Sequence, residues 1–204
     1  MISSSLAGAP TMDEGNRRLL DAAERNTRRQ LKLVEGILEL ARLEEGVLPV
    51  LKEEVPLAVL VEEVLRTTMP AARARGLELV SEVPETLPRV LADQGLVARI
   101  LENLLGNAVK FSQSGAGPIR VSTRLDGTMV DLLVQDSGPG VEEALRPRIF
   151  EKFVVGNHSG RGSGLGLAFC RLAVEAQGGR IRLEHPGPGA VFAFSLPLAP
   201  PPTS

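Results

Sequence analysis

The chain has 204 residues, enough for one globular domain and an additional segment. Its 43% hydrophobic content includes no Trp, no Tyr and only 6 Phe, so the core has to be aliphatic. A net charge of −2 indicates neither a nucleic-acid-binding nor an anionic-membrane surface, and the single Cys170 excludes an internal disulfide framework. No apolar run approaches the ~20 residues that span a bilayer, and no signal peptide is recognisable. We therefore expect a cytoplasmic segment, either of a soluble protein or of the inner part of a membrane protein.

The first predicted element is a long helix. Residues 1–15 are small, polar and typical of a loop, but residues 12–45 contain no Pro and carry apolar residues at heptad spacing, such as Val34 and Ala41. A helix of roughly 30 residues with a wide apolar face needs a partner helix, and the chain supplies none of similar length. We divide the chain into a helical segment (1–48), a domain (49–198) and a disordered tail (199–204).

Helices and strands alternate through the rest of the chain. One helix begins after the N-cap Asp93, and Asp126-Gly127 joins two strands as a hairpin. The other expected helices cover residues 57–75, interrupted at Pro70, and 165–177, and the expected strands cover residues 50–55, 77–83, 89–92, 119–125, 128–135, 180–184 and 190–196. This order predicts an α+β fold, a two-layer sandwich in which about five mixed strands are backed by three helices, with the long helix at its N-terminus.

Polar residues interrupt the apolar side of the helix after Asp93. Asn103, Asn107 and Lys110 lie within an arc of about 60° of that helix. Buried amides and a buried ammonium need partners, and a phosphate chain with its Mg²⁺ would satisfy all three together. An amide oxygen is a hard ligand suited to Mg²⁺. Taken alone, the stretch is also compatible with a capped helix at the edge of the surface.

Three further islands separate the apolar elements. In DSGPG (136–140), Asp136 follows a strand and could accept a hydrogen bond from an amine such as that of adenine, although ordinary turn chemistry also explains it. In GRGSGLGLA (160–168), glycines precede a helix and expose backbone N–H groups, as phosphate sites do. IFEKF (149–153) is suited either to the base of a mobile loop or to a small packing cluster.

In this order, ENLLGNAVKF, DSGPG, IFEKF and GSGLGL resemble the N, G1, F and G2 boxes of the sensor histidine-kinase catalytic domain, which is related to DNA gyrase B, MutL and the heat-shock chaperone ATPases. The resemblance covers about residues 50–198 and implies a Bergerat-type ATP-binding sandwich with Mg-ATP as ligand. It implies that Asn107 binds Mg²⁺ and acts in catalysis with Asn103 and Lys110. The residues expected around the nucleotide are Asn103, Asn107, Lys110, Phe111, Asp136, Gly138, Gly140, Lys152, Phe153, Arg161, Gly162, Gly164, Leu165, Gly166 and Leu167.

The resemblance also favours a kinase over a hydrolase. Hydrolysing relatives place a glutamate four residues before the magnesium asparagine, where it can deprotonate water, and this chain has Asn103 there. Residues 12–46 look like the second helix of a dimerisation and phosphotransfer domain. The first helix of that domain, with its phosphoacceptor histidine, is missing, and neither His158 nor His185 has the right setting. Many relatives carry an arginine after the second phenylalanine of the F box, which Lys152 or Arg161 would have to replace here.

The resemblance therefore implies a protein-histidine kinase module that transfers the γ-phosphoryl of Mg-ATP to a histidine outside this chain. Its expected partners are a phosphoacceptor histidine domain, a response regulator and a second copy bound through the N-terminal helix. No contact with nucleic acid or membrane is expected. The alternatives are a non-catalytic, ATP-binding pseudokinase or interaction module and, because of Asn103 less favoured, an ATPase of the same superfamily.

Overall fold

The computed structural model describes residues 14–156, 163–184 and 189–200. Helix α1 (Glu14–Glu44) belongs to two compact units, because one unit ends at Leu38 and the other begins at Glu39. The boundary predicted from the sequence lies ten residues later, after residue 48. The last turns of α1 lie in the larger unit, where Leu40 and Leu43 are buried. Residues 1–13 and 201–204, which include most of the predicted loop and tail, lie outside the described residues.

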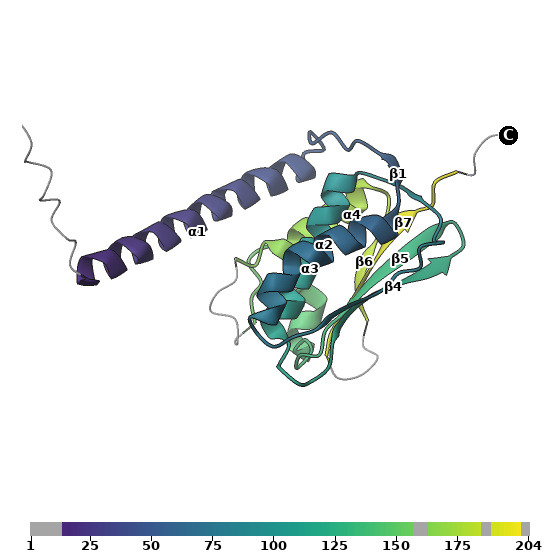
Figure 1. Cartoon of the computed structure of the whole chain (residues 1–204). Coiled ribbons are helices and arrows are strands. Elements are labelled where there is room, and N and C mark those ends of the chain that lie inside the picture. Colours follow the sequence, from purple (N-terminus) through teal and green to yellow (C-terminus); the bar gives the residue numbers. More distant parts are fainter. Residues whose placement is uncertain (1–13, 157–162, 185–188, 201–204) are drawn as a thin grey trace, which may run out of the picture. The chain divides into compact units, whose positions relative to one another are not determined.

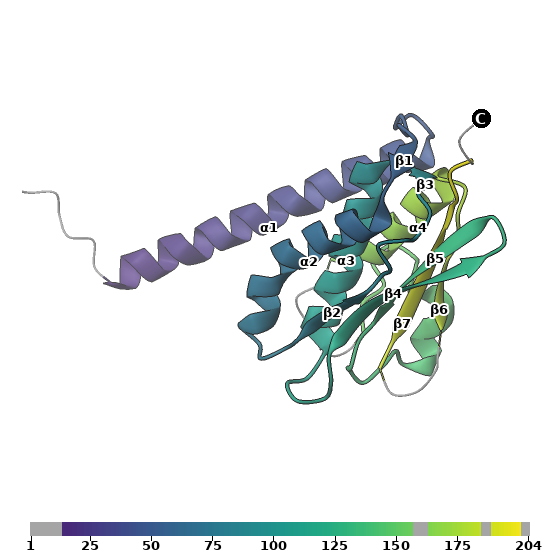
Figure 2. The ribbon, with the colours of Figure 1, turned by 45° about the vertical axis from the view of Figure 1, so that its right-hand side comes forward.

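The larger unit is built on a five-stranded mixed sheet with the strand order β2-β4-β5-β7-β6 (Figures 1 and 2). Only β2 and β4 run parallel, and the other neighbours are antiparallel. The predicted hairpin at Asp126-Gly127 is confirmed, since Asp126 pairs with Met129. The strands are β2 (Leu79–Glu82), β4 (Ile119–Asp126), β5 (Met129–Gln135), β6 (Ile181–Glu184) and β7 (Val191–Pro197), with β1 (Glu53–Val55) and β3 (Val90–Ala92) forming a separate antiparallel pair.

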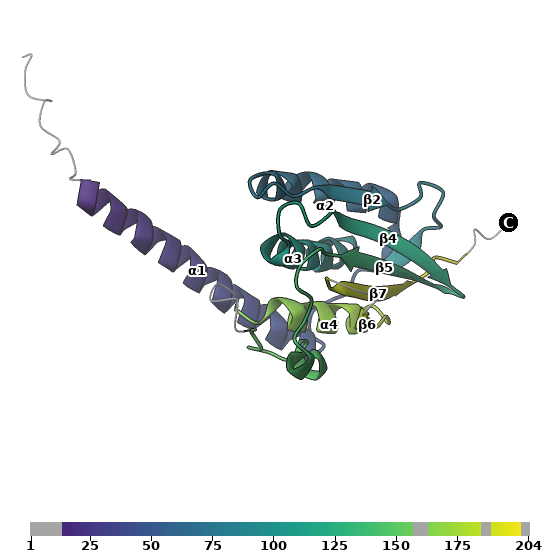
Figure 3. The same ribbon diagram turned by 90° about the horizontal axis from the view of Figure 1, so that it is seen from below.

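Three helices cover one face of this sheet, as Figure 3 shows: α2 (Leu57–Arg73), α3 (Gln94–Phe111) and α4 (Gly166–Ala176). A short 3-10 helix, η1 (Glu143–Arg148), follows β5. The expected interruption at Pro70 is wrong, because α2 continues through it to Arg73. Pro70 lies in the last turn, where its missing N–H removes only one helical hydrogen bond.

Helix α3 is fixed at its start by the predicted cap. Asp93 Oδ1 accepts from the backbone N–H of Leu96 (3.0 Å), and its Oδ2 accepts from that of Leu51 (2.9 Å). The Asp93 N–H in turn donates to Oε1 of the fully buried Gln177, just past the end of α4 (2.8 Å). These bonds set the register of α3 against α4, and so position the polar stripe that the sequence places further along α3.

The core between the helices and the sheet is mainly aliphatic, as the composition predicts, although Phe194 is its largest fully buried side chain. Cys170 is buried among these residues, and burial raises the pKa of its thiol, as expected of a packing residue rather than a nucleophile. Within the part of the chain that the structure describes, no helix is both long and apolar enough to cross a membrane.

Candidate functional site

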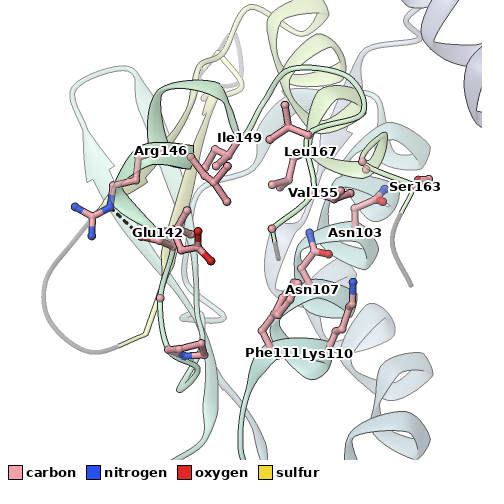
Figure 4. Close-up of a pocket in the computed structure, with 18 of the residues that line it drawn as sticks. Asn103, Asn107, Lys110, Phe111, Glu142, Arg146, Ile149, Val155, Ser163 and Leu167 are labelled. Atoms are coloured by element: carbon pink, nitrogen blue, oxygen red, sulfur yellow. Dashed lines mark hydrogen bonds between the residues drawn. The ribbon is translucent and has the colours of Figure 1, made fainter. Parts of the chain in front are cut away.

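One side of α3 forms a wall of a cavity of about 550 Å³, a volume typical of small-molecule sites. Asn103, Asn107 and Lys110 all line it, and Figure 4 shows them in sequence along α3. The facing wall consists of the segment after β5 and of η1, which includes Glu142 and Arg146. The stripe of polar groups on a core helix is thus explained by the cavity that it faces.

The structure brings eight of the fifteen expected site residues together on this cavity: Asn103, Asn107, Lys110, Phe111, Gly140, Gly164, Gly166 and Leu167. Leu165 is buried in the core at the start of α4, and its N–H donates to Ser163 Oγ (3.2 Å). Arg161 and Gly162 lie outside the described residues. Four expected residues lie outside the cavity wall but within three positions in sequence of a residue that lines it. These four are Asp136, Gly138, Lys152 and Phe153.

Asp136 directly follows the end of β5 and is only 8% exposed. Its Oδ1 accepts two backbone hydrogen bonds, from Gly138 (2.9 Å) and from Ala190 (3.1 Å). Among the described residues no donor is bonded to Oδ2. Burial raises the pKa of the carboxyl, and the two backbone bonds only partly oppose that rise. The turn that contains Gly138 also supplies two cavity residues, Pro139 and Gly140.

Lys110 provides a cation on the α3 wall. Its Nζ lies 4.7 Å from the centroid of the Phe111 ring, and partial burial lowers the pKa of the ammonium. The ring face is a favourable neighbour for a cation that has lost part of its water. Phe111 lines the cavity as well, so an apolar ring and a positive charge are adjacent on the same wall.

Asn103 has a different environment from Asn107. Its Nδ2 donates to the carbonyl of Arg99 in the preceding turn of α3 (2.9 Å). Its Oδ1 lies so close to Gly166, the first residue of α4, that a Cβ there would be only 2.7 Å away. Gly166 therefore allows α3 and the N-terminus of α4 to approach closely, and the first two residues of α4, Gly166 and Leu167, both line the cavity.

The F box and the glycine loop are joined by their backbones. The N–H of Phe153 donates to the carbonyl of Gly164 (2.9 Å), and both residues have positive φ angles, 63° and 69°. A Cβ on Gly164 would lie 2.6 Å from the Phe153 carbonyl carbon, so only glycine fits. Phe153 itself is 62% exposed, and Lys152 Nζ is paired with Glu44 at the end of α1 (2.6 Å).

The facing wall of the cavity was not predicted from the sequence. Val141, Leu145 and Ile149 line it at four-residue spacing, a helix-like signal that runs from just after the G1 box to the first residue of the F box. The 3-10 helix η1 carries Leu145 in this wall, and the wall is held by the bond from Arg146 Nε to the carbonyl of Val141 (2.9 Å), drawn dashed in Figure 4.

Residues 92–200 match the family described as histidine kinase-, DNA gyrase B- and HSP90-like ATPases. The chain belongs to this family. The resemblance to the histidine-kinase catalytic domain and the predicted α+β fold class are therefore confirmed. The chain carries the ATP-binding domain of a sensor histidine kinase. No group of three His, Cys, Asp or Glu side chains suited to hold a metal occurs among residues 14–156, 163–184 and 189–200.

Relatives of the histidine kinase domain include whole sensor proteins. The sensory/regulatory protein RpfC of Xanthomonas campestris is 35% identical in a 199-residue alignment that covers 92% of this chain and 27% of RpfC. The alginate biosynthesis sensor protein KinB of Pseudomonas aeruginosa is 33% identical over 182 residues, 88% of this chain and 30% of KinB. The chain thus spans less than a third of the length of either relative.

Solved structures agree with this assignment. Full-length ShkA in complex with AMPPNP superposes with a TM-score of 0.81 and 33% identity, over 94% of this chain and 41% of ShkA. The catalytic domain of the histidine kinase ThkA gives a TM-score of 0.66 and 30% identity, over 72% of this chain and 96% of that domain. The comparison with ThkA thus aligns nearly all of one isolated catalytic domain with 72% of this chain.

Proposed function

We propose that the cavity binds Mg-ATP and that the γ-phosphoryl is transferred to a histidine side chain of another domain. One observation carries the proposal: Asn107 and Lys110 on α3 and the N-terminus of α4 face a single cavity of nucleotide size. A triphosphate requires cations and N–H donors on one side and space for a base on the other, and the walls of this cavity supply both.

At the base end, Asp136 is the candidate for recognising adenine. Its Oδ1 is occupied by two backbone N–H groups, which leaves Oδ2 as the acceptor for an exocyclic amine. Because the carboxylate is buried, a hydrogen bond to it discriminates strongly between a donor and an acceptor on the ligand. The apolar residues Ile149, Val155 and Leu167 of the cavity suit the faces of a purine ring.

At the phosphate end, Asn107 and Lys110 have complementary roles. The amide oxygen of Asn107 is one hard ligand for Mg²⁺, and such a site is completed by phosphate oxygens and water rather than by a cage of protein carboxylates. When bound, Mg²⁺ neutralises charge on the phosphates and favours transfer. Lys110 adds a positive charge beside them, and Gly164 and Gly166 offer backbone N–H groups at the start of α4.

Asn103 favours transfer to a protein acceptor over hydrolysis. An amide has no basicity with which to deprotonate water. Both ends of this amide are also engaged, Nδ2 with the Arg99 carbonyl and Oδ1 against Gly166. In the transfer itself, an imidazole nitrogen bonds to the γ-phosphorus as the bond to the β,γ-bridging oxygen breaks, ADP departs, and the imidazole proton passes to a base of the acceptor domain.

The partners follow from the same proposal. Both histidines of the chain, His158 and His185, lie outside the described residues, and we propose that the acceptor is a histidine on a separate helical domain, from which a response regulator takes the phosphoryl group. A second copy of the chain is proposed to cover the exposed apolar side chains of α1. Those side chains are Leu19, Leu20, Leu31, Val34, Ile37 and Leu38. We keep residues 1–48 as the partial dimerisation segment, 49–198 as the catalytic domain and a cytoplasmic location as parts of this proposal.

The test is transfer between separate proteins. The chain is mixed with γ-labelled Mg-ATP and a separate histidine-bearing phosphoacceptor domain, and acid-labile label on that domain is measured. We expect transfer that falls about 100- to 1,000-fold in Asn107→Ala, the loss typical when one group that stabilises developing charge is removed. Exposed Glu45→Gln is the control and should transfer normally. Nucleotide binding without any transfer would overturn the kinase proposal.

A non-catalytic ATP-binding module is the second candidate, because one observation favours it. Lys152, a candidate replacement for the arginine that many relatives carry after the F-box phenylalanine, is paired with Glu44 and does not line the cavity. For such a module, calorimetry would show Mg-ATP binding, and the transfer assay would show no label on the acceptor domain. Steady release of ADP without an acceptor would instead indicate an ATPase.

A further inference from the structure

The end of α1 is attached to the ATP-binding unit by two ion pairs on either side of two buried leucines. Glu39 pairs with Arg99 of α3, and Glu44 pairs with Lys152 beside the F-box phenylalanine. Between them, Leu40 and Leu43 are 2% and 8% exposed. Apolar burial holds this segment in place, and the ion pairs determine where its charges lie.

The two pairs differ in how firmly their cations are held. The guanidinium of Arg99 lies 4.4 Å from the centroid of the Phe169 ring, and its residue's carbonyl accepts from Asn103. Lys152 and Glu44 are each about two-fifths exposed, with side-chain values of 38% and 41%. Arg99 is itself 41% exposed, so the ring contact rather than burial distinguishes the two cations. A lysine on a flexible stem can change partners at low cost, whereas an arginine stacked on a ring would also have to give up that contact.

The backbone of Lys152 is held close to the cavity. Ile149, three residues before it, and Val154, two residues after it, both line the cavity. The next residue, Phe153, is fixed by its bond to Gly164, another cavity residue. The side chain of Lys152 is therefore attached at the cavity rim while its charge is held by the last residue of α1.

We propose that Glu44 is a positioning residue that holds Lys152 away from the nucleotide, so that a phosphate of bound ATP and the end of α1 compete for the same ammonium. This rests on the proposed ATP site. An exposed pair is weak enough for a triphosphate to displace it. Coupling between two sites is reciprocal: Glu44 weakens ATP binding, and ATP binding loosens the end of α1 by the same factor.

Calorimetry of Mg-ATP binding at low salt tests this with the unchanged chain, Glu44→Gln and the matched control Glu45→Gln. Glu45 is the neighbouring exposed residue, and its substitution removes the same charge. We expect Glu44→Gln to bind about two- to fivefold more tightly than the unchanged chain, Glu45→Gln to bind equally, and the gain to disappear in ~0.5 M salt. In a Lys152→Gln background, Glu44→Gln should have no effect.

A second measurement follows the helix rather than the ligand. The N–H groups of Glu45, Gly46 and Val47 bond back to the last turns of α1, and saturating Mg-ATP should increase their hydrogen exchange in the unchanged chain but not in Lys152→Gln. Equal or weaker binding by Glu44→Gln than by Glu45→Gln would overturn the inference alone. Absence of ATP binding by every variant, the unchanged chain included, would overturn the proposed function and the inference with it.

Discussion

Two buried carboxylates, five positions apart at β5, have opposite surroundings. Asp131 is 3% exposed and lies between arginines: its Oδ2 accepts from Arg182 Nη2 (2.6 Å) and from Arg124 Nη2 (2.9 Å). Asp136 is 8% exposed, and among the described residues no cation is bonded to it. Burial acts to raise the pKa of both, but the arginine bonds outweigh it at Asp131, whose pKa is lowered, whereas the pKa of Asp136 is raised.

The difference separates a carboxylate that is neutralised within the fold from one that we propose binds the nucleotide. Asp131 is on the sheet face away from the helices, where its charge is neutralised within the fold by strands β4 and β6. Asp136 keeps an oxygen, Oδ2, to which no donor of the described residues is bonded, at the end of the strand beside the cavity, so this oxygen can accept from a ligand. The sequence alone marked Asp136 by its glycines and did not mark Asp131 at all.

Among the tests of this contrast, the largest expected effect is on nucleotide affinity in Asp136→Asn. The two backbone donors hold the amide oxygen at the Oδ1 position, so the NH₂ group replaces Oδ2 and faces the amine of adenine. We expect ATP binding to weaken about 10- to 100-fold, with a smaller loss for GTP, whose carbonyl accepts from that NH₂. Titration calorimetry with both nucleotides measures this. Unchanged ATP affinity and unchanged selectivity between ATP and GTP would refute the role of Asp136 in binding adenine, and with it the functional contrast with Asp131.

Next in size is the loss of stability in Asp131→Asn. Two arginines lose a charged acceptor, and we expect the free energy of unfolding to fall by about 1–2 kcal/mol. The loss is smaller than for a fully buried pair because the side chains of Arg182 and Arg124 are 34% and 49% exposed and can be hydrated. Chemical denaturation measures it, and ATP affinity of the folded variant should be unchanged. Equal stability to the unchanged chain would contradict the structural role.

The contributions of Asp136 and Asp131 to stability should change in opposite directions with pH. Asp136, with a raised pKa, binds a proton more readily in the folded state, so its contribution to the free energy of unfolding increases as pH falls from 7 toward about 4. Asp131, with a lowered pKa, contributes stability above the ordinary aspartate range and loses it as pH falls below that range. Unfolding curves of each Asn variant, compared with the unchanged chain across this range, isolate the two contributions. Parallel curves for both variants would show that their surroundings do not differ as described.

The smallest expected effect is that of Glu82→Gln on the same sheet. Glu82 pairs with Arg120, but both side chains are nearly half exposed, at 47% and 42%. Exposed pairs contribute little, and we expect a change in the free energy of unfolding below about 1 kcal/mol that vanishes in high salt. The same denaturation experiment measures it beside Asp131→Asn. A loss as large as that of Asp131→Asn would mean that burial is not what distinguishes the pairs.

Residues that act on near neighbours could be predicted from the sequence. The cap of α3 depends on Asp93 and Leu96, three positions apart, and the hairpin depends on Asp126 and Gly127 alone. The polar stripe on α3 follows from the helical period of 3.6 residues. Pro70 was misjudged because a proline in the last turn removes one bond without ending α2.

Residues that act across the fold could not be assigned in this way. Lys152 was expected at the nucleotide, but its ammonium is paired with Glu44, 108 positions earlier. The wall that faces α3 was missed because η1 comes to lie opposite α3 only after the sheet and the helices are assembled.

The order of residues along this chain thus specifies its helices, its hairpin and the boxes of its ATP site, because hydrogen bonds between close neighbours and the helical period act within a few residues. Only the folded arrangement determined that Asp131, rather than Asp136, is bonded to arginines, and that Lys152 pairs with the end of α1. Those outcomes depend on burial and on charges brought together from distant parts of the chain, and no local pattern of residues encodes how those parts meet.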